Sequence, residues 1–580
     1  MRRFVSFGTA MASSIAVCGL HMTGGRSIIN STKWVKTLFR RDVGTNAAAA
    51  QGEALRKEET DVQDGPQSLY AVLAERQEQA ERSVLISCLS KTSEKKFLKY
   101  LSKHGEINKH FFYESYGMYA VVEFASRESV SALMEDASFP SVSHESVVPF
   151  KSRLLSLRGA SSADSPHGSQ LIQSQTSMPI NELIRRLSRE DSVDQQVISL
   201  TEAYQLTDEN IRLRFLVCSL LKDITTAYFP ECTIKPFGSS VNGFGKLGCD
   251  LDMFLDLDAI TKGKNKLLKS GLSVEFQMKG ANSERAVTQS VLSVIGECVD
   301  QFGPGCVGVQ KILNARCPLV RFAHQPSGFQ CDLTANNRVA MKSTELLYLY
   351  GELDPRVRSL VFTVRCWARA HGITSSIPGA WITNFSLTVM VLFFLQRRSP
   401  PIIPTLNHLR DLAGPEDTSV IEGNDCTFVS DFSRIQLQVN TETLEKLISE
   451  FFEFYASFAY SRMSIDIRKG QEQNKPQVTP LHIQNPFETS LNISKNVNAA
   501  QLDRFVALCQ ESTWLLQQSE ATTSGGDASS DTATPWGLAT LLLPSQVAGV
   551  KSNKKRRQKQ TSERIKSLLE SLKQNNQQKS

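Results

Sequence analysis

The stretch KPFGSSVNGFGKLGCDLD, residues 235–252, constrains this chain more than any other part of it. A Gly-Ser-Ser turn precedes two aspartates, Asp250 and Asp252, which are spaced i and i+2. If residues 250–257 (DLDMFLDL) form a strand, alternation places both carboxylates on one face. Two carboxylates this close repel each other and make a seat for a hard cation such as Mg²⁺ or Mn²⁺. We therefore expect a metal-binding strand that follows a tight turn.

The turn itself has the residues of a phosphate cradle. Gly238 lets the backbone come close to a ligand, and Ser239 and Ser240 offer hydroxyl and N–H groups to phosphate. A D-x-D pair alone also occurs on ordinary surface strands. Joined to a G-S-S turn at this spacing, the carboxylate pair predicts two-metal phosphoryl transfer.

The order Gly-Ser, a dozen residues and Asp-x-Asp resembles the nucleotidyltransferase superfamily of DNA polymerase β. The resemblance implies a third carboxylate on a neighbouring strand. Downstream, PLVRF (318–322) and FQCDLTA (329–335) are two short apolar runs separated by AHQPSG, which is the pattern of a hairpin. We expect Asp332, in the second run, to complete the metal site and to accept the proton of an attacking hydroxyl.

The helical half of the chain narrows the resemblance. Together with the catalytic core, over residues 180–515, it is similar to the non-canonical poly(A) and poly(U) polymerases with their PAP-associated domain. Arg365 and Arg369 are spaced i and i+4 and share one helix face. In the family, two basic residues at these places hold the triphosphate, so the resemblance implies that role here. A solvated basic face is the alternative.

Two further segments concern the nucleotide. Thr383-Asn384-Phe385 falls where relatives carry Ser-Ser-Tyr, which implies that Phe385 stacks on the base and that Asn384 contacts phosphate. A core position for Phe385 is the alternative. Ser343-Thr344 falls where relatives carry Asn-Thr, which implies a place near the ribose.

The late motif IQNPFETSLN, residues 483–492, resembles the base-recognition loop of the family. In relatives that prefer uridine, a histidine commonly precedes the asparagine, whereas here Leu491 precedes Asn492. Leucine has no hydrogen-bonding group, so it offers uracil no polar contact. We therefore expect both residues beside the base and a preference for ATP over UTP.

A small α/β module is expected before the catalytic core. Residues 81–152 have the order β-α-β-β-α, which resembles an RRM, but Val121 stands where a stacking aromatic is usual. Packing, dimer contacts and weak RNA contact are the roles left open. The fold class is therefore α/β plus α: a polymerase β-like nucleotidyltransferase palm with a helical PAP-associated domain, preceded by the RRM-like module. The expected order is a transit peptide 1–41, a linker 42–80, the module 81–152, a linker 153–179, the catalytic domain 180–342, the helical domain 343–515 and a low-complexity, basic tail 516–580.

The first 41 residues contain no Asp or Glu but are rich in Arg, Lys and Ser. This composition is typical of a mitochondrial transit peptide and predicts import into the matrix. A secretory signal with AMASSIAVCGL (10–20) as its apolar core is the rival. The chain has 12 cysteines without a C-x-x-C pair, which favours a reducing compartment. The basic run 554–557 is either a nuclear signal or a solvated tail that helps to hold RNA.

Together with these features, the resemblance implies an enzyme that extends RNA 3′ ends, those of mitochondrial transcripts, by attack of the 3′-hydroxyl on the α-phosphorus of ATP. No template-reading domain is evident, which suits untemplated addition. Uridylyl transfer and an inactive RNA-binding scaffold are the alternatives. The three clustered acids argue against the scaffold. The longest apolar run, 387–395, is too short to span a bilayer, so we expect no membrane partner.

Overall fold

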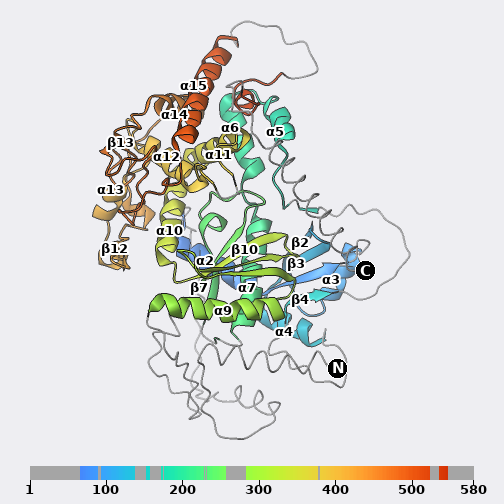
Figure 1. Ribbon diagram of the computed structural model, residues 1–580. Coiled ribbons are helices and arrows are strands. Elements are labelled where there is room, and N and C mark those ends of the chain that lie inside the picture. The colour runs from blue at the N-terminus through green and yellow to red at the C-terminus, as the bar shows by residue number, and fades with distance from the viewer. Residues whose placement is uncertain are drawn as a thin grey trace, which may run out of the picture.

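The computed structural model describes residues 66–88, 93–136, 152–156, 172–173, 175–226, 229, 232–256, 283–375, 379–522 and 534–545. These residues form an α/β module, a palm built on a sheet, and a helical domain that lies above the palm in Figure 1. The expected transit peptide, most of the expected low-complexity segment and the basic run 554–557 lie outside the described residues.

The palm is a five-stranded sheet of order β6-β7-β10-β9-β8. β7 and β10 are parallel, whereas β9 and β10 form the antiparallel hairpin expected from the sequence. α7 and α9 pack with the strands around one apolar core, and α9 lies across the sheet in Figure 1. The elements are α7 (Asp208–Thr225), β6 (Thr233–Pro236), η1 (Gly238–Ser240), β7 (Leu251–Asp256), α9 (Glu284–Phe302), β8 (Cys306–Ile312), β9 (Leu319–His324) and β10 (Phe329–Ala335).

The module has a sheet of order β4-β1-β3-β2-β5. Its three long strands and two helices follow the expected β-α-β-β-α order. Short parallel strands, β4 and β5, extend both edges from within the segment expected to be a linker. The elements are α2 (Leu69–Glu81), β1 (Ser83–Cys88), α3 (Glu94–Leu101), β2 (Ile107–Glu114), β3 (Met118–Phe124), α4 (Arg127–Asp136), β4 (Leu154–Ser156) and β5 (Ile172–Gln173).

The sheet face that bears Val121 is buried against the palm. Val121, Leu85, Phe111 and Tyr113 belong to the same apolar core as α7 and the palm strands. An RRM stacks RNA bases on this face, but here protein covers it. Of the roles left open for the module, packing is therefore the one that this face performs.

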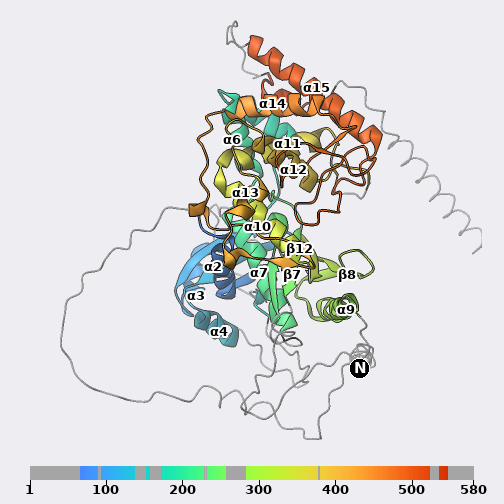
Figure 2. The same cartoon turned by 90° about the vertical axis from the view of Figure 1, so that its left-hand side faces the viewer.

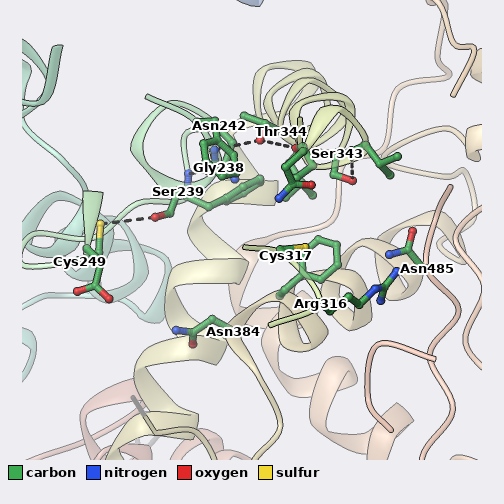
Figure 3. Close-up of a pocket in the computed structure, with 18 of the residues that line it drawn as sticks. Gly238, Ser239, Asn242, Cys249, Arg316, Cys317, Ser343, Thr344, Asn384 and Asn485 are labelled. Carbon is green, nitrogen blue, oxygen red and sulfur yellow. Dashed lines mark hydrogen bonds between the residues drawn. The ribbon is translucent and has the colours of Figure 1, made fainter. Parts of the chain in front are cut away.

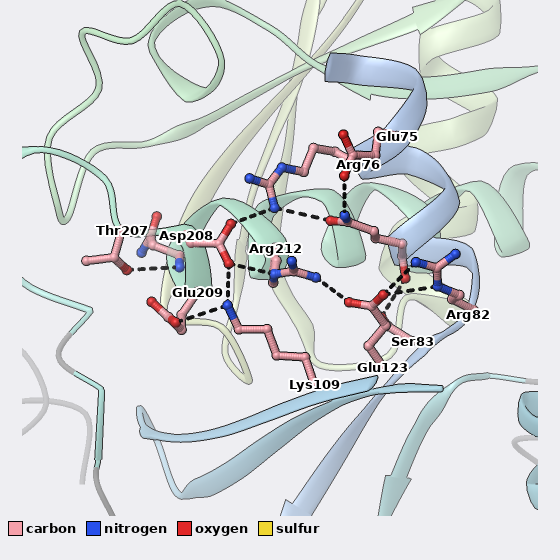
Figure 4. Close-up of polar contacts among 12 residues, drawn as sticks. Glu75, Arg76, Arg82, Ser83, Lys109, Glu123, Thr207, Asp208, Glu209 and Arg212 are labelled. Carbon is pink, nitrogen blue, oxygen red and sulfur yellow. Dashed lines mark hydrogen bonds and ion pairs between the residues drawn. The ribbon is translucent and has the colours of Figure 1, made fainter. Parts of the chain in front are cut away.

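A network of charged side chains links the module to α7 of the palm (Figure 4). Asp208, at the start of α7, contacts Arg76 of α2 at 2.6 Å, Lys109 of β2 at 2.5 Å and Arg212 at 2.7 Å. Arg212 also pairs with Glu123 of β3. Burial opposes the charge of Asp208, but hydrogen bonds from Lys109 and Arg212 and the charge of Arg76 more than offset it and lower the pKa of Asp208. The network fixes the module to α7.

The helical domain surrounds α12, in which every residue from Ser386 to Gln396 is buried, as the apolar run predicted. α5 and α6 were expected in the catalytic domain, but α6 packs on α11 and α14 and α5 packs on α6, with their apolar faces buried in the core of the helical domain. Figure 2 shows α14 and α15 crossing the top of this domain. The helices are α5 (Ile180–Leu187), α6 (Val193–Tyr204), α10 (Arg338–Leu353), α11 (Pro355–Ala370), α12 (Asn384–Gln396), α13 (Leu406–Asp411), α14 (Leu444–Ser457), α15 (Ala499–Thr522) and α16 (Leu538–Leu541).

Short elements fill the loops between α13 and α15. They are η2 (Pro415–Asp417), β11 (Val420–Ile421), β12 (Asn424–Asp425), η3 (Phe432–Arg434), β13 (Met463–Ser464) and β14 (Gln473–Asn474). Among the helices described, none has the length and apolar character needed to cross a membrane.

Part of the expected tail belongs to the core of the helical domain. Leu538 of α16 is fully buried, because its helix packs on α5, α6 and α15. The Gln196 side chain of α6 donates to the Trp536 carbonyl at 3.2 Å and accepts from the Leu538 N–H at 2.7 Å. α15 also continues beyond residue 515, where we expected the domain to end.

Candidate active site

The three predicted carboxylates lie together at one place on the palm sheet. Asp252 of β7 and Asp332 of β10 occupy paired positions on parallel strands, and Asp250 directly precedes β7. Burial, together with the charges of Asp332 and Asp250, raises the pKa of Asp252 to about 7. Burial and Asp332 also raise the pKa of Asp250. Such shifts arise when carboxylates share one site.

A hard divalent cation suits this donor set, because carboxylate oxygens are its preferred ligands. Asp332, however, directs both oxygens to Arg321 of β9, with Nε–Oδ1 at 2.7 Å and Nη2–Oδ2 at 2.6 Å. Within the described ranges, no three Asp, Glu, His or Cys side chains come close enough to hold one ion together. The three carboxylates therefore have suitable donor atoms for the metal, but both oxygens of Asp332 bind Arg321 instead.

One buried arginine joins the turn to the carboxylate strand. Arg214 of α7 is fully buried, and its guanidinium donates to Ser240 Oγ at 2.9 Å and to the carbonyls of Asp250 at 2.9 Å and Cys249 at 2.7 Å. The Ser240 hydroxyl is therefore engaged behind the turn. Ser240 does not line the cavity described below, which corrects our expectation that it contacts phosphate.

Gly238 needs to be glycine at this turn. Its φ of +61° is in the left-handed region, and a Cβ there would lie 3.2 Å from Asp252 Oδ2. Its N–H donates to Thr344 Oγ1 of α10 at 3.0 Å, and that hydroxyl in turn donates to the Ala340 carbonyl at 2.8 Å. α10 thus supports the turn from behind, and Thr344 has a structural bond as well as a place on the cavity wall.

A cavity of about 1200 Å³ opens beside Asp250, between the palm and the helical domain. Figure 3 shows the Gly238–Ser239 turn near Ser343 and Thr344, with Arg316 and Asn485 across the cavity. Most of the predicted nucleotide-binding residues line it. They are Gly238, Ser239, Ser343, Thr344, Arg365, Arg369, Asn384 and Phe385.

The two predicted arginines have different environments. The Arg365 guanidinium donates to the carbonyls of Phe244 at 2.7 Å and Asn384 at 3.3 Å and also bonds Thr388, and burial lowers the pKa of Arg365 to about 10. Arg369 is exposed on the cavity wall. Arg365 therefore braces α12 against the palm, and Arg369 is the arginine placed to meet an anion.

Phe385, near the start of α12, lies between the helical core and the cavity. It is partly buried against the helical core, and it also lines the cavity. Asn384 beside it is exposed to the cavity, and its carbonyl accepts from Arg365. A ring anchored in this way is rigid enough to stack on a base.

The late loop reaches the cavity with residues other than those expected. Asn485 and Glu488 line the cavity, whereas Leu491 and Asn492 do not. Asn492 is buried, and its Oδ1 accepts from the N–H of Ile483 at 3.1 Å and of Ser494 at 2.9 Å. Asn492 therefore shapes the loop from inside, which corrects the expectation of a direct contact with the base.

Three cations that line the cavity, Lys246, Arg285 and Arg316, were missed in the sequence. Lys246 lines the cavity, and burial together with Arg369 lowers its pKa. It lies between glycines in the motif itself, so a charge within a Gly-rich turn was the available signal. Arg316 pairs with Glu488 of the late loop, a contact between distant segments that no local pattern indicates.

Comparison with known proteins identifies the family. The model of the "Poly(A) RNA polymerase, mitochondrial-like, central palm domain" matches residues 193–352, and that of the RL domain matches residues 68–138. The mitochondrial poly(A) RNA polymerase of Mus musculus is 58% identical over 506 residues, which cover 87% of this chain and 86% of that protein. The corresponding protein of Homo sapiens is 58% identical over 503 residues, covering 86% and 85%.

Solved structures agree with this result. The crystal structure of mtPAP in complex with ATPγS has a TM-score of 0.75 at 51% identity, covering 83% of this chain and 100% of that chain. Further mtPAP crystal structures contain CTP, UTP and GTP. By sequence and by fold, this chain belongs to the family of mitochondrial poly(A) RNA polymerases, which are nucleotidyltransferases.

Proposed function

We propose that this poly(A) polymerase adds adenylate to RNA 3′ ends without a template. The RNA 3′-hydroxyl attacks the α-phosphorus of ATP, and pyrophosphate leaves. The observation that carries the proposal is the pairing of Asp252 with Asp332 across parallel strands, beside Asp250 and a cavity lined by a Gly-Ser turn. Paired carboxylates next to a phosphate cradle are the equipment for phosphoryl transfer.

The carboxylates have distinct roles in this proposal. Asp332 accepts the proton of the 3′-hydroxyl. Asp250 and Asp252, with Asp332 as a further ligand, would hold Mg²⁺ or Mn²⁺, which when bound stabilises the charge that develops on the phosphates. Burial and the charges of Asp332 and Asp250 raise the pKa of Asp252, and this supports the assignment because a bound cation would offset both effects.

The cavity wall supplies the contacts for the triphosphate. Gly238 and Ser239 present a turn that a phosphate can approach closely. Lys246 and Arg369 add two positive charges on the same wall. Because these charges are fixed before the reaction, they stabilise the departing pyrophosphate without reorganisation.

The base occupies the part of the cavity near Phe385, which stacks on it. Asn485 and Glu488 of the late loop meet its edge. Asn485 Oδ1 already accepts from the N–H groups of Phe487 and Glu488, each at 3.0 Å. The Nδ2 group of Asn485 is therefore left to donate to a base. We propose that ATP is preferred over UTP.

We further propose that the enzyme works in the mitochondrial matrix on transcripts made there. The support is the acid-free, Arg-rich composition of residues 1–41 and the mitochondrial relatives. A fluorescent protein fused to residues 1–41 should colocalise with a matrix marker. Cytosolic or secretory fluorescence would overturn this part of the proposal.

A primer-extension assay tests the reaction. Purified protein is incubated with an oligo(A) primer and each of the four nucleoside triphosphates, with Mg²⁺ or Mn²⁺, and the products are separated on a gel. We expect a ladder with ATP and much shorter products with UTP, CTP and GTP. A UTP ladder as long as the ATP ladder would indicate uridylyl transfer, and no product under any condition would indicate an inactive scaffold.

A further inference from the structure

Arg321 of β9 binds Asp332 through two parallel hydrogen bonds. Nε lies 2.7 Å from Oδ1 and Nη2 lies 2.6 Å from Oδ2, and the two residues are directly opposite each other in the β9–β10 hairpin. This pair matches the planar fork of a guanidinium with both oxygens of a carboxylate. While it persists, Asp332 is turned away from a site shared with Asp250 and Asp252.

The two partners differ in exposure. The Arg321 side chain is 48% exposed, whereas that of Asp332 is 15% exposed. Arg214, the other arginine beside these carboxylates, is fully buried and held by Ser240 and two backbone carbonyls. The exposed guanidinium of Arg321 can be reached by other anions from solvent, and each new hydrogen bond to such an anion offsets one lost to Asp332. A competing anion can therefore take Arg321, but not Arg214.

The reaction brings such an anion to this place. The RNA 3′-hydroxyl must reach Asp332, and the phosphodiester of the terminal nucleotide lies only one sugar away from that hydroxyl. Phosphate oxygens fit the guanidinium fork as well as a carboxylate does. In nucleic-acid complexes, arginine contacts of this kind fix the position of the backbone.

Resting on the proposed roles of the three carboxylates, we propose that Arg321 is a positioning residue that couples RNA binding to assembly of the metal site. In the RNA-free enzyme, Arg321 holds Asp332 away from Asp250 and Asp252. When the terminal phosphodiester takes the guanidinium, Asp332 is released toward the other two. ATP bound without RNA then meets an incomplete site, which protects it from hydrolysis.

Mn²⁺ binding to the RNA-free full chain tests the holding step, with isothermal titration calorimetry as the measurement. We expect Arg321→Ala to lower the Mn²⁺ Kd by about tenfold, because a third carboxylate becomes available. Arg321→Lys keeps the charge but cannot form the fork, so its Kd should fall as well. Lys311→Ala on neighbouring β8, which removes a charge from the same sheet, should bind Mn²⁺ as wild type does.

The releasing step is tested with RNA. Oligo(A) with a 3′-deoxy end, which cannot be extended, should lower the Mn²⁺ Kd of the wild type by about tenfold and leave that of Arg321→Ala unchanged. An otherwise identical oligo(A) with a neutral methylphosphonate as its last linkage should have no effect on the wild type. Arg321→Ala should also release AMP from ATP without RNA several times faster than wild type.

Unchanged Mn²⁺ affinity in Arg321→Ala or Arg321→Lys overturns the holding step. An equal effect of the methylphosphonate and the normal oligo(A) overturns the releasing step. The proposed function fails separately: if adding Asp332→Ala to Arg321→Ala leaves Mn²⁺ binding unchanged, then Asp332 is not a metal ligand. Thermal unfolding of each variant, compared with wild type, verifies that the fold is retained.

Discussion

Arg316 of the palm forms an ion pair with Glu488 of the helical domain, and both side chains line the cavity. The loop that carries Arg316 is fixed in turn, because the Arg285 guanidinium of α9 donates to the carbonyls of Ala315 at 2.6 Å and Arg316 at 3.0 Å. This ion pair is thus one of the contacts that join the two domains at the cavity, and a charge exchange can break and restore it.

Breaking this contact should weaken ATP binding. Arg316→Glu and Glu488→Arg each place like charges together, which drives the two walls apart. We expect the KM for ATP to rise roughly fivefold in each variant and to recover in part in the double exchange, which restores the ion pair but not the place of Glu488 at the base. Initial rates at saturating primer measure this, with Lys311→Glu as a surface control. A double variant no better than the poorer single one contradicts the idea.

Removing one carboxylate of the triad should abolish extension. Asp252→Asn and Asp332→Asn each delete a charged oxygen, which should lower kcat/KM on the order of 10³-fold or more. Because Asp252 sits among repelling charges, neither change should unfold the protein. Single-turnover extension and thermal unfolding on the same samples separate catalysis from folding. Near-wild-type extension by either variant refutes the assignment.

The raised pKa of Asp252 predicts a pH dependence. The folded pKa of about 7 exceeds the ordinary value, so without metal this group favours folding below about pH 4 and loses that contribution as pH rises through 7. In EDTA, Asp252→Asn should therefore have a higher Tm than wild type at pH 8 and the same Tm at pH 4. Equal Tm values at both pH values would show that the shift is absent.

Metal binding should also depend on the protonation state of Asp252. Since the ion must displace a proton from Asp252, the apparent Mg²⁺ affinity of the wild type should fall below pH 7 and be nearly constant above pH 8. Calorimetric titration in two buffers with different ionisation enthalpies measures the proton released. No proton release at pH 6.5 argues against Asp252 as a ligand.

The module should support catalysis through the catalytic hairpin. Tyr113 donates its hydroxyl to the Pro326 carbonyl at 2.8 Å, and Ser115 donates to the Gln325 carbonyl at 2.9 Å, both in the turn between β9 and β10. Tyr113→Phe leaves a buried carbonyl unsatisfied and should cost about 1–3 kcal/mol. We expect a several-fold lower kcat and an unchanged ATP/UTP ratio. Tyr116→Phe, at a 77% exposed position in the turn between β2 and β3, is the matched control.

Leu491→His should leave nucleotide choice unchanged. Leu491 does not line the cavity, so a histidine there adds no contact to the base. Relative kcat/KM for ATP and UTP, measured on protein with normal circular dichroism, provides the comparison. A tenfold shift toward UTP would show that Leu491 lies beside the base, as the motif predicted.

The parts of the site that the sequence predicted are local. Alternation along β7 and the hairpin pattern of β9 and β10 are sufficient to place Asp250, Asp252 and Asp332. Arg214 lies in a long, largely buried helix, and nothing in its neighbourhood shows that its charge is satisfied by carbonyls from residues 249 and 250. Such bonds depend on tertiary packing, which neither hydrophobic periodicity nor a sequence motif can predict.

Loops and short strands are the other parts of the structure that the sequence did not predict. β4 has three residues and exists only because β1 offers a free edge, so the segment lacks the length that a strand pattern needs. In the late loop, the motif predicted that a base-recognition loop is present but not which side chains face the cavity. Asn492 points into the loop because its Oδ1 accepts hydrogen bonds from backbone N–H groups on both sides of the loop.

The position of α16 has a consequence for the order of folding. The Gln196 side chain bonds to Trp536 and Leu538, more than 300 residues further along the chain. During synthesis, α5 and α6 therefore emerge long before the segment that covers them. Their apolar faces are fully covered only when residues 536–542 arrive and close the helical domain.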